Sequence, residues 1–295
     1  MTCIGFLACA DTLPGDGPRR GDAVEHDLEV AALRPAFEDA GLELVELDWR
    51  APLSDFSGLA MVMLGTAWDY QDHPTEFLVR LEALAGMGIA VCNPPRVVRW
   101  NTEKTYLREL EERGARIVPT IWLEDAGADD VLASMDMFAA HRVVVKRKVG
   151  AGGIGQHSFT HDTLPAAGWR MGRPCMIQPF LESVVEEGEY TFVFVDNQFS
   201  HGVLKRAAEG EYRIQSLYGG REFDYAPSPG DLAQAQAIVD ALPFDDLLYC
   251  RIDMARLPDG QLAVMEAEAI EPYLYPEQGP QLGARLAEAV RRRLA

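Results

Sequence analysis

The sequence predicts an α/β fold in two parts, an open α/β domain at the N-terminus and a longer region of α+β character after it. Short apolar runs alternate with helical segments through the first hundred residues, which is the rhythm of β-α-β units. The rest of the chain is richer in strands, and near its end two strands are joined by Asp-Gly. With 295 residues, 48% of them hydrophobic, the chain can form two or three lobes with sizeable cores.

The first hundred residues predict a mostly parallel sheet with helices between its strands. The apolar runs have the length of strands, and the segments between them place apolar residues at helical spacing. A kink is expected at Pro35, and Asn93-Pro94-Pro95 marks a domain boundary. The expected strands cover residues 4–8, 42–47, 59–64 and 89–92, and the expected helices cover residues 25–40 and 74–85.

The remainder of the chain is predicted to be rich in strands. A helix over residues 103–113 comes first, capped by Asn101 or Thr102 and closed by Gly114. Two further helices, over residues 231–242 and 280–294, are expected to pack on this region. The expected strands cover residues 117–122, 142–147, 156–160, 175–180, 189–195, 199–204, 249–257 and 261–267.

The composition excludes several classes of function. A formal net charge of −19 argues against a nucleic-acid partner, because phosphate backbones are bound by basic surfaces. An ordinary solvated acidic surface explains this charge and identifies no substrate. No run of eighteen apolar residues predicts a membrane span, and the opening segment lacks the basic leader of a signal peptide. Five cysteines without CxxC spacing indicate reduced thiols in a cytoplasmic protein and no zinc site.

The strongest motif is a hairpin near the C-terminus. Two strands flank Asp259-Gly260, and a turn centred there pairs residues whose numbers sum to 519. Asp253 then faces Glu266, and Arg251 faces Glu268. Because alternate side chains of a strand share a face, all four project to the same side. The sequence therefore predicts three converging carboxylates with one guanidinium among them.

Converging carboxylates repel one another unless a cation compensates them. Oxygen ligands without histidine or thiolate suit Mg²⁺ or Mn²⁺ better than zinc. The alternative is a surface hairpin with an Arg–Glu pair on its solvated face. The opposite face favours the metal site because its residues are apolar and indicate a packed hairpin. These residues are Ile252, Met254, Met265 and Ala267.

A second motif is a glycine-rich loop after an apolar strand that ends with Lys146. Glycines at 150, 152, 153 and 155 let backbone N–H groups approach phosphate oxygens. No Gly-Lys-Ser/Thr follows, so the loop is not a P-loop, and residues 156–160 read as a strand rather than a helix. A flap between two strands fits this pattern, with a structural glycine turn as the alternative.

Three weaker signals complete the set. The strand over residues 175–180 runs into an irregular proline segment whose backbone could meet the edge of an adenine. Lys104 lies in the first turn of the expected 103–113 helix, and Lys205 ends an apolar strand. Each lysine taken alone is equally compatible with an ordinary surface position.

Taken in order along the chain, these motifs resemble the ATP-grasp superfamily. Residues 189–193, the Arg251-Ile252-Asp253 strand and the Glu266-x-Glu268 pair are similar to those of D-alanine–D-alanine ligases and glutathione-synthetase-like enzymes. The resemblance covers roughly residues 93–275. Finer cues look closest to the cycloserine-synthetase-like branch, which joins parts of one substrate intramolecularly. They are Trp68-Asp69-Tyr70, Asn93-Pro94-Pro95, Val98-Arg99-Trp100-Asn101 and Glu271-Pro272-Tyr273-Leu274-Tyr275.

The resemblance implies a leading α/β domain over residues 1–98 and a two-lobed ATP-grasp fold after it. Residues 99–181 would form a helix and the small ATP-binding lobe with its glycine-rich lid, and residues 182–295 would form the C-terminal lobe with the metal site. Glu189 would hold the ribose hydroxyls, unless the longer stretch before it shifts that role to Glu186 or Glu187. The other implied nucleotide contacts are Lys104, Lys146, Gly150, Gly152, Gly153, Gln178, Pro179, Phe180 and Leu181.

The same resemblance implies the chemistry. Asp253, Glu266 and Glu268 would ligate two Mg²⁺ ions, although many relatives carry Asn where this chain has Glu268. Lys205 and Arg251 would neutralise the transferring phosphoryl group and the oxyanion. A substrate carboxylate would be activated by ATP as an acyl phosphate and then attacked by an amine or similar nucleophile. The expected substrate contacts are Trp68, Asp69, Arg213, Ser216, Tyr218, Gly219 and Gly220.

Two other functions are weighed against the ligase. A non-catalytic nucleotide-binding protein with this fold is disfavoured by the complete set of acidic and basic motif residues. A nicotinamide oxidoreductase is disfavoured because no GxGxxG follows the first strand. The expected partner is a small-molecule carboxylate, with no membrane and no nucleic acid. Dimers are common among similar enzymes, so the resemblance allows a homodimer.

Overall fold

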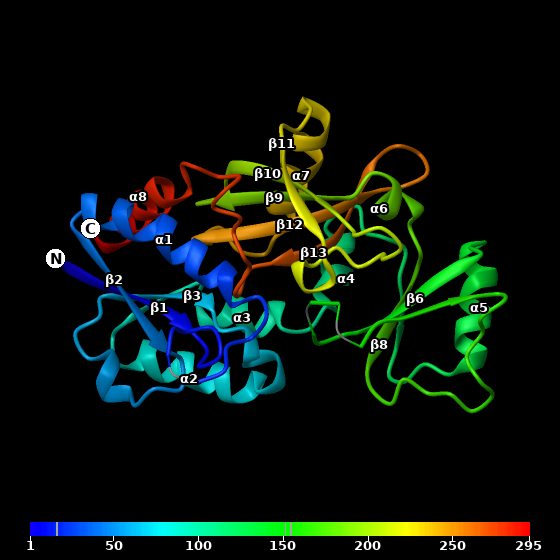
Figure 1. The fold of residues 1–295 in the computed structure, drawn as a ribbon, viewed down its shortest axis with the longest axis horizontal. Coiled ribbons are helices and arrows are strands. Elements are labelled where there is room, and N and C mark those ends of the chain that lie inside the picture. Colours follow the sequence, from blue (N-terminus) through cyan, green and yellow to red (C-terminus); the bar gives the residue numbers. More distant parts are fainter. Residues whose placement is uncertain (16, 151, 154) are drawn as a thin grey trace.

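The chain folds around three separate sheets (Figure 1). The computed structural model describes residues 1–15, 17–150, 152–153 and 155–295. Two residues of the predicted flap, Ala151 and Ile154, lie outside the described residues. In the described part the strand orders are β2-β1-β3-β4, β5-β8-β6-β7 and β11-β10-β9-β12-β13.

The N-terminal sheet is parallel, as the β-α-β alternation predicts. Helix α1 contains Pro35 and ends at the predicted place, before Gly41. The expected strands and helices are confirmed to within two residues at each end. The elements are β1 (Thr2–Ala8), α1 (Ala23–Asp39), β2 (Leu42–Asp48), η1 (Leu53–Phe56), β3 (Met61–Thr66), η2 (Trp68–Asp72), α2 (Pro74–Gly86) and β4 (Ala90–Cys92).

The predicted helix over residues 103–113 forms only from Tyr106 to Glu112, and a helix that precedes it was not predicted. The chain forms two short helices, α3 (Pro95–Asn101) and α4 (Tyr106–Glu112), so Lys104 lies in the turn between them. Asn101 ends α3 and caps nothing. Its side-chain amide instead bonds the backbone of the C-terminal hairpin, donating to the Ala267 carbonyl at 2.7 Å and accepting from the Ala269 N–H at 2.8 Å.

The small sheet is antiparallel and carries one helix on its face. Three of its strands match the prediction, but of residues 117–122 only the end belongs to a strand, and Ile117 instead bridges to Val264. Helix α5 (Ala128–Phe138) was not predicted. The strands are β5 (Ile121–Leu123), β6 (Arg142–Arg147), β7 (His157–Thr160) and β8 (Cys175–Pro179).

The large sheet is also antiparallel and forms the body of the C-terminal part. Its edge strand β11 (Arg221–Tyr225) and the short helices α6 (Glu182–Glu186) and η3 (Ser216–Tyr218) were not predicted. The predicted helix near its edge is α7 (Pro229–Ala241). The remaining strands, all predicted, are β9 (Glu189–Val195), β10 (Gln198–Arg206), β12 (Tyr249–Arg256) and β13 (Leu262–Glu268).

The last helix, α8 (Leu282–Leu294), lies beside α1 of the N-terminal domain (Figure 1). It also contacts β9, as expected for a helix that packs on the strand-rich region. The two helices approach closely, because a Cβ on Gly283 would lie 2.6 Å from the Ala32 carbonyl oxygen. One apolar cluster joins Leu33 of α1 and Leu286 of α8 to Val193 of the large sheet. The N-terminal sheet and the large sheet therefore share a core.

The hairpin pairs Asp253 with Glu266 and Arg251 with Glu268, as predicted. It reaches this register through two deviations that cancel. The turn is one residue longer than predicted, with Arg256 opposite Leu262, and a bulge on β13 shifts the register back between Asp253 and Met254. The bulged residue is Met265, which lines the central cavity instead of facing away with Ile252 and Met254, so the prediction for Met265 is wrong.

Candidate active site

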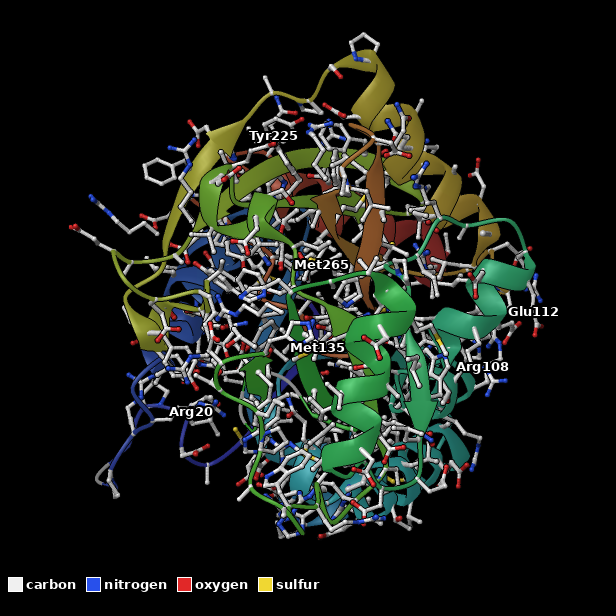
Figure 2. All side chains as sticks on the ribbon, turned by 90° about the vertical axis from the view of Figure 1, so that its right-hand side faces the viewer. Arg20, Arg108, Glu112, Met135, Tyr225 and Met265 are labelled. Atoms are coloured by element: carbon white, nitrogen blue, oxygen red, sulfur yellow. The ribbon has the colours of Figure 1, made fainter. Side chains whose placement is uncertain are left out.

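A cavity of about 560 Å³ lies where the three sheets meet. Its walls come from the loops of the N-terminal domain, the strands of the small sheet, and the cavity face of β12 and β13. The cavity lining includes all the residues proposed from the sequence except Tyr218, Gly219 and Gly220. In side view Met265 lies near the middle of the molecule, whereas Arg108 and Glu112 lie at its periphery (Figure 2). The fold thus gathers residues from distant parts of the chain.

The centre of the cavity is a buried cluster of charges on the large sheet. Arg251 donates from Nε to Oδ2 of Asp253 at 3.1 Å and from its terminal nitrogens to Glu268 and to the Tyr273 carbonyl. Lys205 reaches Oδ1 of Asp253 at 2.9 Å and also pairs with Glu189. Two cations thus share Asp253, and each holds a second carboxylate.

The charged neighbours and burial shift the pKa values of Asp253 and Glu268 in opposite directions. Burial would raise the pKa of Asp253, but the charges of Arg251 and Lys205 outweigh it and lower that pKa to about 2. Burial raises the pKa of Glu268 to about 7, because the repulsion of Glu266 and Asp253 adds to it and Arg251 compensates only in part. Asp253 is therefore a fixed anion, whereas Glu268 gains most from an additional cation in the cavity.

The carboxylates of the cavity suit Mg²⁺ as ligands, although they do not form a preassembled metal site. Among the described residues, no three acidic, histidine or cysteine side chains already converge as a metal site. Glu266 is paired with Lys104, and the side chains of Glu266 and Glu268 remain 26% and 21% exposed toward the cavity. Mg²⁺ is typically held by one or two carboxylates together with substrate phosphates. Glu266 and Glu268, on one face of β13, offer this arrangement.

Two further lysines belong to the opposite wall. Lys146 of β6 donates to Oε1 of Gln178 at 2.9 Å, and Gln178 in turn donates to Oγ1 of Thr120 at 2.9 Å. Burial lowers the pKa of Lys146, with partial compensation from Glu266. Lys104 donates to the Gly150 carbonyl at 2.7 Å, so it links the start of the glycine-rich loop to β13. Lys104, Lys146 and Lys205 thus supply positive charge from three directions.

The predicted substrate contacts of the N-terminal domain are only partly available. The Asp69 carboxylate accepts from Trp49 Nε1 at 2.7 Å and pairs with Arg50, so it is already occupied. Trp68 borders the cavity, donating from Nε1 to the Glu271 carbonyl at 2.9 Å. The guanidinium of Arg20 lies 5.0 Å from the centre of the Trp68 ring. The Trp68 side chain therefore forms part of the cavity wall where the N-terminal domain meets the C-terminal part.

Comparison with known proteins shows similarity to D-cycloserine synthetase in both sequence and fold. Residues 4–93 match the family described as D-cycloserine synthetase DcsG, N-terminal domain. The cycloserine biosynthesis protein DcsG of Streptomyces lavendulae is 27% identical over 284 residues, covering 91% of this chain and 94% of that protein. The crystal structure of D-cycloserine synthetase DcsG matches with a TM-score of 0.82 and 23% identity, over 99% of this chain and 100% of that one.

Two other solved structures share the fold. The D-alanine–D-alanine ligase of Bacillus anthracis, complexed with ATP, matches with a TM-score of 0.68 and 16% identity over 100% of this chain and 97% of its own. The ATP-grasp ligase PsnB, complexed with a minimal precursor, Mg and ADP, matches with a TM-score of 0.65 and 16% identity over 99% and 97%. The chain has the fold of the ATP-grasp ligases. In sequence and fold it is similar to D-cycloserine synthetase, which confirms the resemblance found in the sequence.

A loop beside the cavity contains glycines that its backbone conformation requires. A Cβ on Gly220 would lie 1.8 Å from the Ile214 carbonyl oxygen, and Gly219 has a φ of 81°. Tyr218 stacks on Arg213, whose guanidinium carbon lies 3.6 Å from the ring centre. Tyr218, Gly219 and Gly220 do not line the cavity, so they shape the loop that carries Arg213 and Ser216. Their role as direct substrate contacts stays a prediction.

The sequence analysis did not predict several acidic residues of the cavity lining, because these residues are scattered along the chain and form no motif. Glu25, in the first turn of α1, accepts from the Ser216 hydroxyl across the domain boundary. Burial, together with the charges of Asp22 and Glu222, raises the pKa of Glu25 to about 7, although the hydrogen bond from Ser216 opposes the shift. Other lining residues not predicted from the sequence include Asp11, Arg20, Asp72, Tyr273 and Tyr275.

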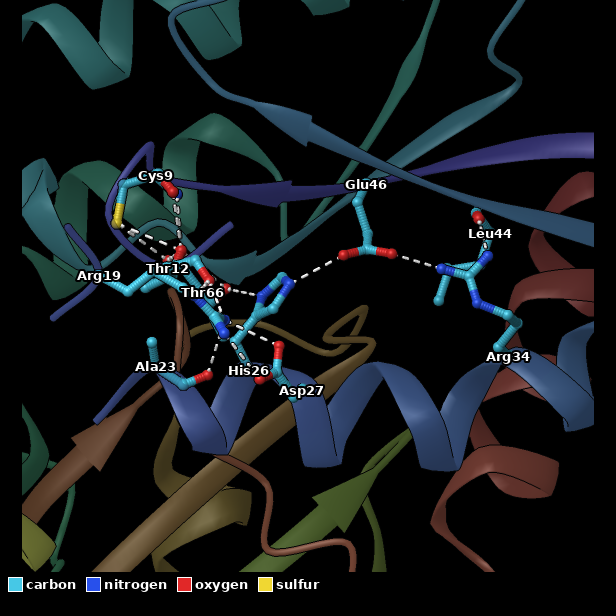
Figure 3. A network of polar contacts seen from close by, with 10 residues as sticks. All are labelled: Cys9, Thr12, Arg19, Ala23, His26, Asp27, Arg34, Leu44, Glu46 and Thr66. Carbon is cyan, nitrogen blue, oxygen red and sulfur yellow. Dashed lines mark hydrogen bonds and ion pairs between the residues drawn. The ribbon is translucent and has the colours of Figure 1, made fainter. Parts of the chain in front are cut away.

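A polar network behind α1 holds this end of the cavity in place (Figure 3). The buried His26 ring joins Oγ1 of Thr66 at 2.6 Å to Oε2 of Glu46 at 2.9 Å. Arg34 extends this network by donating hydrogen bonds to Glu46 and to the Leu44 carbonyl. The network ties the start of α1 to β2 and β3, and therefore positions Glu25, the neighbour of His26.

Glu29 lies one turn beyond Glu25 on α1. Its burial predicts that the free energy of unfolding depends measurably on pH. It is 2% exposed, and its Oε2 has no hydrogen-bond partner among the described residues. Burial raises its pKa to about 8, from 4.5. The folded protein therefore keeps the proton that the unfolded chain loses above 4.5, and stability falls as pH rises from 4.5 to 8.

Replacing Glu29 with Gln should remove this dependence. The variant should match the parent near pH 5 and exceed its free energy of unfolding by on the order of 3 kcal/mol at pH 8. Urea unfolding at both pH values measures the difference, with Glu38→Gln on the exposed side of the same helix as control. An equal effect of Glu29→Gln at the two pH values would contradict the assigned cause.

Among the described residues, no helix has both the length and the apolar character needed to cross a bilayer.

Proposed function

We propose that this ligase uses ATP and Mg²⁺ to activate the carboxylate of a small amino-acid-like substrate as an acyl phosphate, which a nitrogen of the same molecule then attacks. The similarity to D-cycloserine synthetase over nearly the whole chain supports an intramolecular reaction. The observation that carries the proposal is the paired hairpin, which directs Asp253, Glu266 and Glu268 into a cavity with Lys104, Lys146 and Lys205.

The nucleotide would lie between the small sheet and the cavity face of β13. Backbone groups of Pro179 and Leu181 would meet the adenine edge, with Gln178 and Phe180 beside it and Met265 on the opposite face. Lys104 and Lys146 would bind the phosphates, and Gly150, Gly152 and Gly153 would cover them. Glu189 would accept from the ribose hydroxyls with the oxygen that Lys205 leaves free.

Glu266 and Glu268, with Asp253, would hold two Mg²⁺ ions. When bound, the ions neutralise the charge that develops on the phosphates during transfer. In the absence of the nucleotide, Lys104 and Arg251 occupy these carboxylates. Lys104 could then turn from Glu266 to a phosphate, because the proposed position of the phosphates is beside Glu266 in the cavity.

Lys205 and Arg251 would stabilise the charges of the reaction. The substrate carboxylate attacks the γ-phosphorus, the bond to ADP breaks, and an acyl phosphate forms. The nitrogen then attacks the acyl carbon, and phosphate leaves from the tetrahedral intermediate. Arg251, fixed by Asp253 and by the Tyr273 carbonyl, is oriented to donate to the oxyanion. Closure of the glycine-rich loop would exclude water, which otherwise hydrolyses the acyl phosphate.

Release of ADP tests the proposal. The protein is incubated with ATP, Mg²⁺ and pooled small carboxylates that do or do not carry a second nitrogen. ADP formation should require Mg²⁺ and a carboxylate, and hydroxylamine should trap the acyl phosphate as a hydroxamate. Nucleotide binding without carboxylate-dependent ADP formation across the pool would contradict the proposal.

A further inference from the structure

Strand β13, which ends at Glu268, forms one edge of the large sheet. Its outer edge is not open to water here, because Ala267 and Ala269 are each only 2% exposed. Backbone N–H and C=O groups at a buried edge need hydrogen-bond partners. At Val264, earlier in the strand, the backbone of residues 116–118 supplies these partners. Beside Glu268, side chains supply them instead.

Asn101 bonds the backbone on both sides of Glu268. Its side-chain amide donates to the Ala267 carbonyl at 2.7 Å and accepts from the Ala269 N–H at 2.8 Å, as a neighbouring strand would do. The Tyr106 hydroxyl accepts from the Ala267 N–H at 3.0 Å. Three of the four backbone groups that flank Glu268 are thus held by side chains of the segment that contains α3 and α4.

The fourth group, the Ala269 carbonyl, accepts from Asn93 at 2.8 Å. Asn93 has a second task, because its side chain makes two further hydrogen bonds to the backbone at the start of β12. The hydrogen bonds of the Asn101 side chain, in the described part of the chain, all go to the two residues that flank Glu268. Asn101 is therefore the side chain whose removal acts most directly on the position of Glu268.

Glu268 depends on such support because regular structure ends there. The segment that follows β13 is irregular, and on the cavity side the Glu268 carboxylate pairs with Arg251. Mg²⁺ demands a nearly ideal octahedral arrangement of its ligands. Residues that orient a metal ligand from behind therefore contribute strongly to metal affinity, although they do not touch the metal. Asn101 occupies this place, since it supports Glu268 and does not line the cavity.

We propose that Asn101 is a positioning residue for the metal site, which holds the Glu268 carboxylate where Mg²⁺ on the phosphates of the nucleotide can reach it. The inference rests on the proposed ligase function and adds a residue that touches neither nucleotide nor metal. The chain continues from Asn101 to Lys104, which pairs with Glu266. One short segment between α3 and α4 thus holds both acids of β13, one through its backbone and the other through its side chain.

The experiment measures how much Mg²⁺ tightens the binding of ADP, by calorimetry with and without the metal. In the parent protein the dissociation constant of ADP should be at least about tenfold lower with Mg²⁺. In Asn101→Ala the constant without metal should stay within about threefold of the parent, whereas the tightening by Mg²⁺ should fall by roughly tenfold. ADP formation by this variant should be impaired at low Mg²⁺ and should recover as Mg²⁺ is raised.

Ser183→Ala is the matched control. The Ser183 hydroxyl donates to the Arg256 carbonyl at 2.6 Å, at the other end of the same hairpin, and Ser183 does not line the cavity. This variant loses a bond of the same kind and should keep both ADP constants within about twofold of the parent. Tyr106→Phe keeps the packing of the ring and removes only the partner of the Ala267 N–H. It should reduce the tightening by about threefold, and it tests the inference if Asn101→Ala does not fold.

Thermal unfolding identifies the variants that are folded. An equal loss of ADP affinity with and without Mg²⁺ in folded Asn101→Ala would overturn the inference, since it indicates a general structural role. Unchanged tightening by Mg²⁺ in that variant, or in Tyr106→Phe where Asn101→Ala is unfolded, would overturn it as well. A parent protein that does not bind ADP, or whose ADP binding Mg²⁺ does not tighten, would instead overturn the proposed function, so the two failures are distinguishable.

Discussion

Replacing Glu266 with Gln should abolish ADP formation while the protein stays folded. The amide keeps the shape of the side chain and can still accept from Lys104, so the local structure is preserved. It removes the negative charge that would hold Mg²⁺ against the phosphates. Loss of metal stabilisation of the transferring phosphoryl group is worth several kcal/mol, so kcat should fall by at least about 1000-fold.

Asp259→Asn is the matched control for Glu266→Gln. Asp259 is at the tip of the same hairpin, outside the cavity, where it pairs with Arg116 on the surface. This variant should keep kcat within about twofold of the parent, since exposed pairs contribute little. Thermal unfolding of both variants checks that they are folded, and titration with Mg²⁺ should show a weakened response only for Glu266→Gln. Turnover near that of the parent in Glu266→Gln would contradict the metal assignment.

Replacing Arg251 with Met should strongly destabilise the protein as well as inactivate it. Arg251 is 8% exposed and compensates Asp253 and Glu268 at once. Removing one partner of a buried ion pair leaves the other charge uncompensated, which typically costs about 3–5 kcal/mol. Urea unfolding should therefore show a loss of that size at pH 7.

Two comparisons separate this electrostatic effect from simple loss of packing. Arg116→Met removes the guanidinium of the exposed Arg116–Asp259 pair and should cost no more than about 1 kcal/mol. Adding Glu268→Gln to Arg251→Met neutralises one of the two abandoned carboxylates and should restore part of the lost stability. If Arg251→Met costs no more than Arg116→Met, or the double variant is no more stable than the single one, the buried charges do not explain the effect.

Some elements could be predicted because their signal is local. Strands β6 and β9 were predicted at their observed bounds, since each contains a run of apolar residues, Val143–Val145 in β6 and Phe192–Val195 in β9. The pairing of Asp253 with Glu266 was predicted correctly, although the observed turn is one residue longer and a bulge on β13 compensates for it. The roles of these residues toward ATP and Mg²⁺ remain predictions that the variants above would test.

Other elements could not be predicted because tertiary contacts decide them. Asn101 has the side chain of a helix cap, but bonds to the Ala267 and Ala269 backbone outweigh that use, and the expected helix begins only at Tyr106. Helix α5 was missed although its buried residues, Val131 and Met135, have helical spacing. The bulge that turns Met265 into the cavity has no signature in an otherwise regular strand.

The sequence by itself determined the β-α-β beginning, the strand-rich remainder and the shared face of Glu266 and Glu268 on their strand, because spacing along one strand or helix decides them. Only the tertiary structure decided which distant residues share the cavity. It placed Glu25 of α1 beside Ser216, paired Lys104 with Glu266, and buried Glu271 in the wall of the cavity. The physical reason is that burial and compensation of charge depend on contacts between segments far apart in the chain, which no local pattern records.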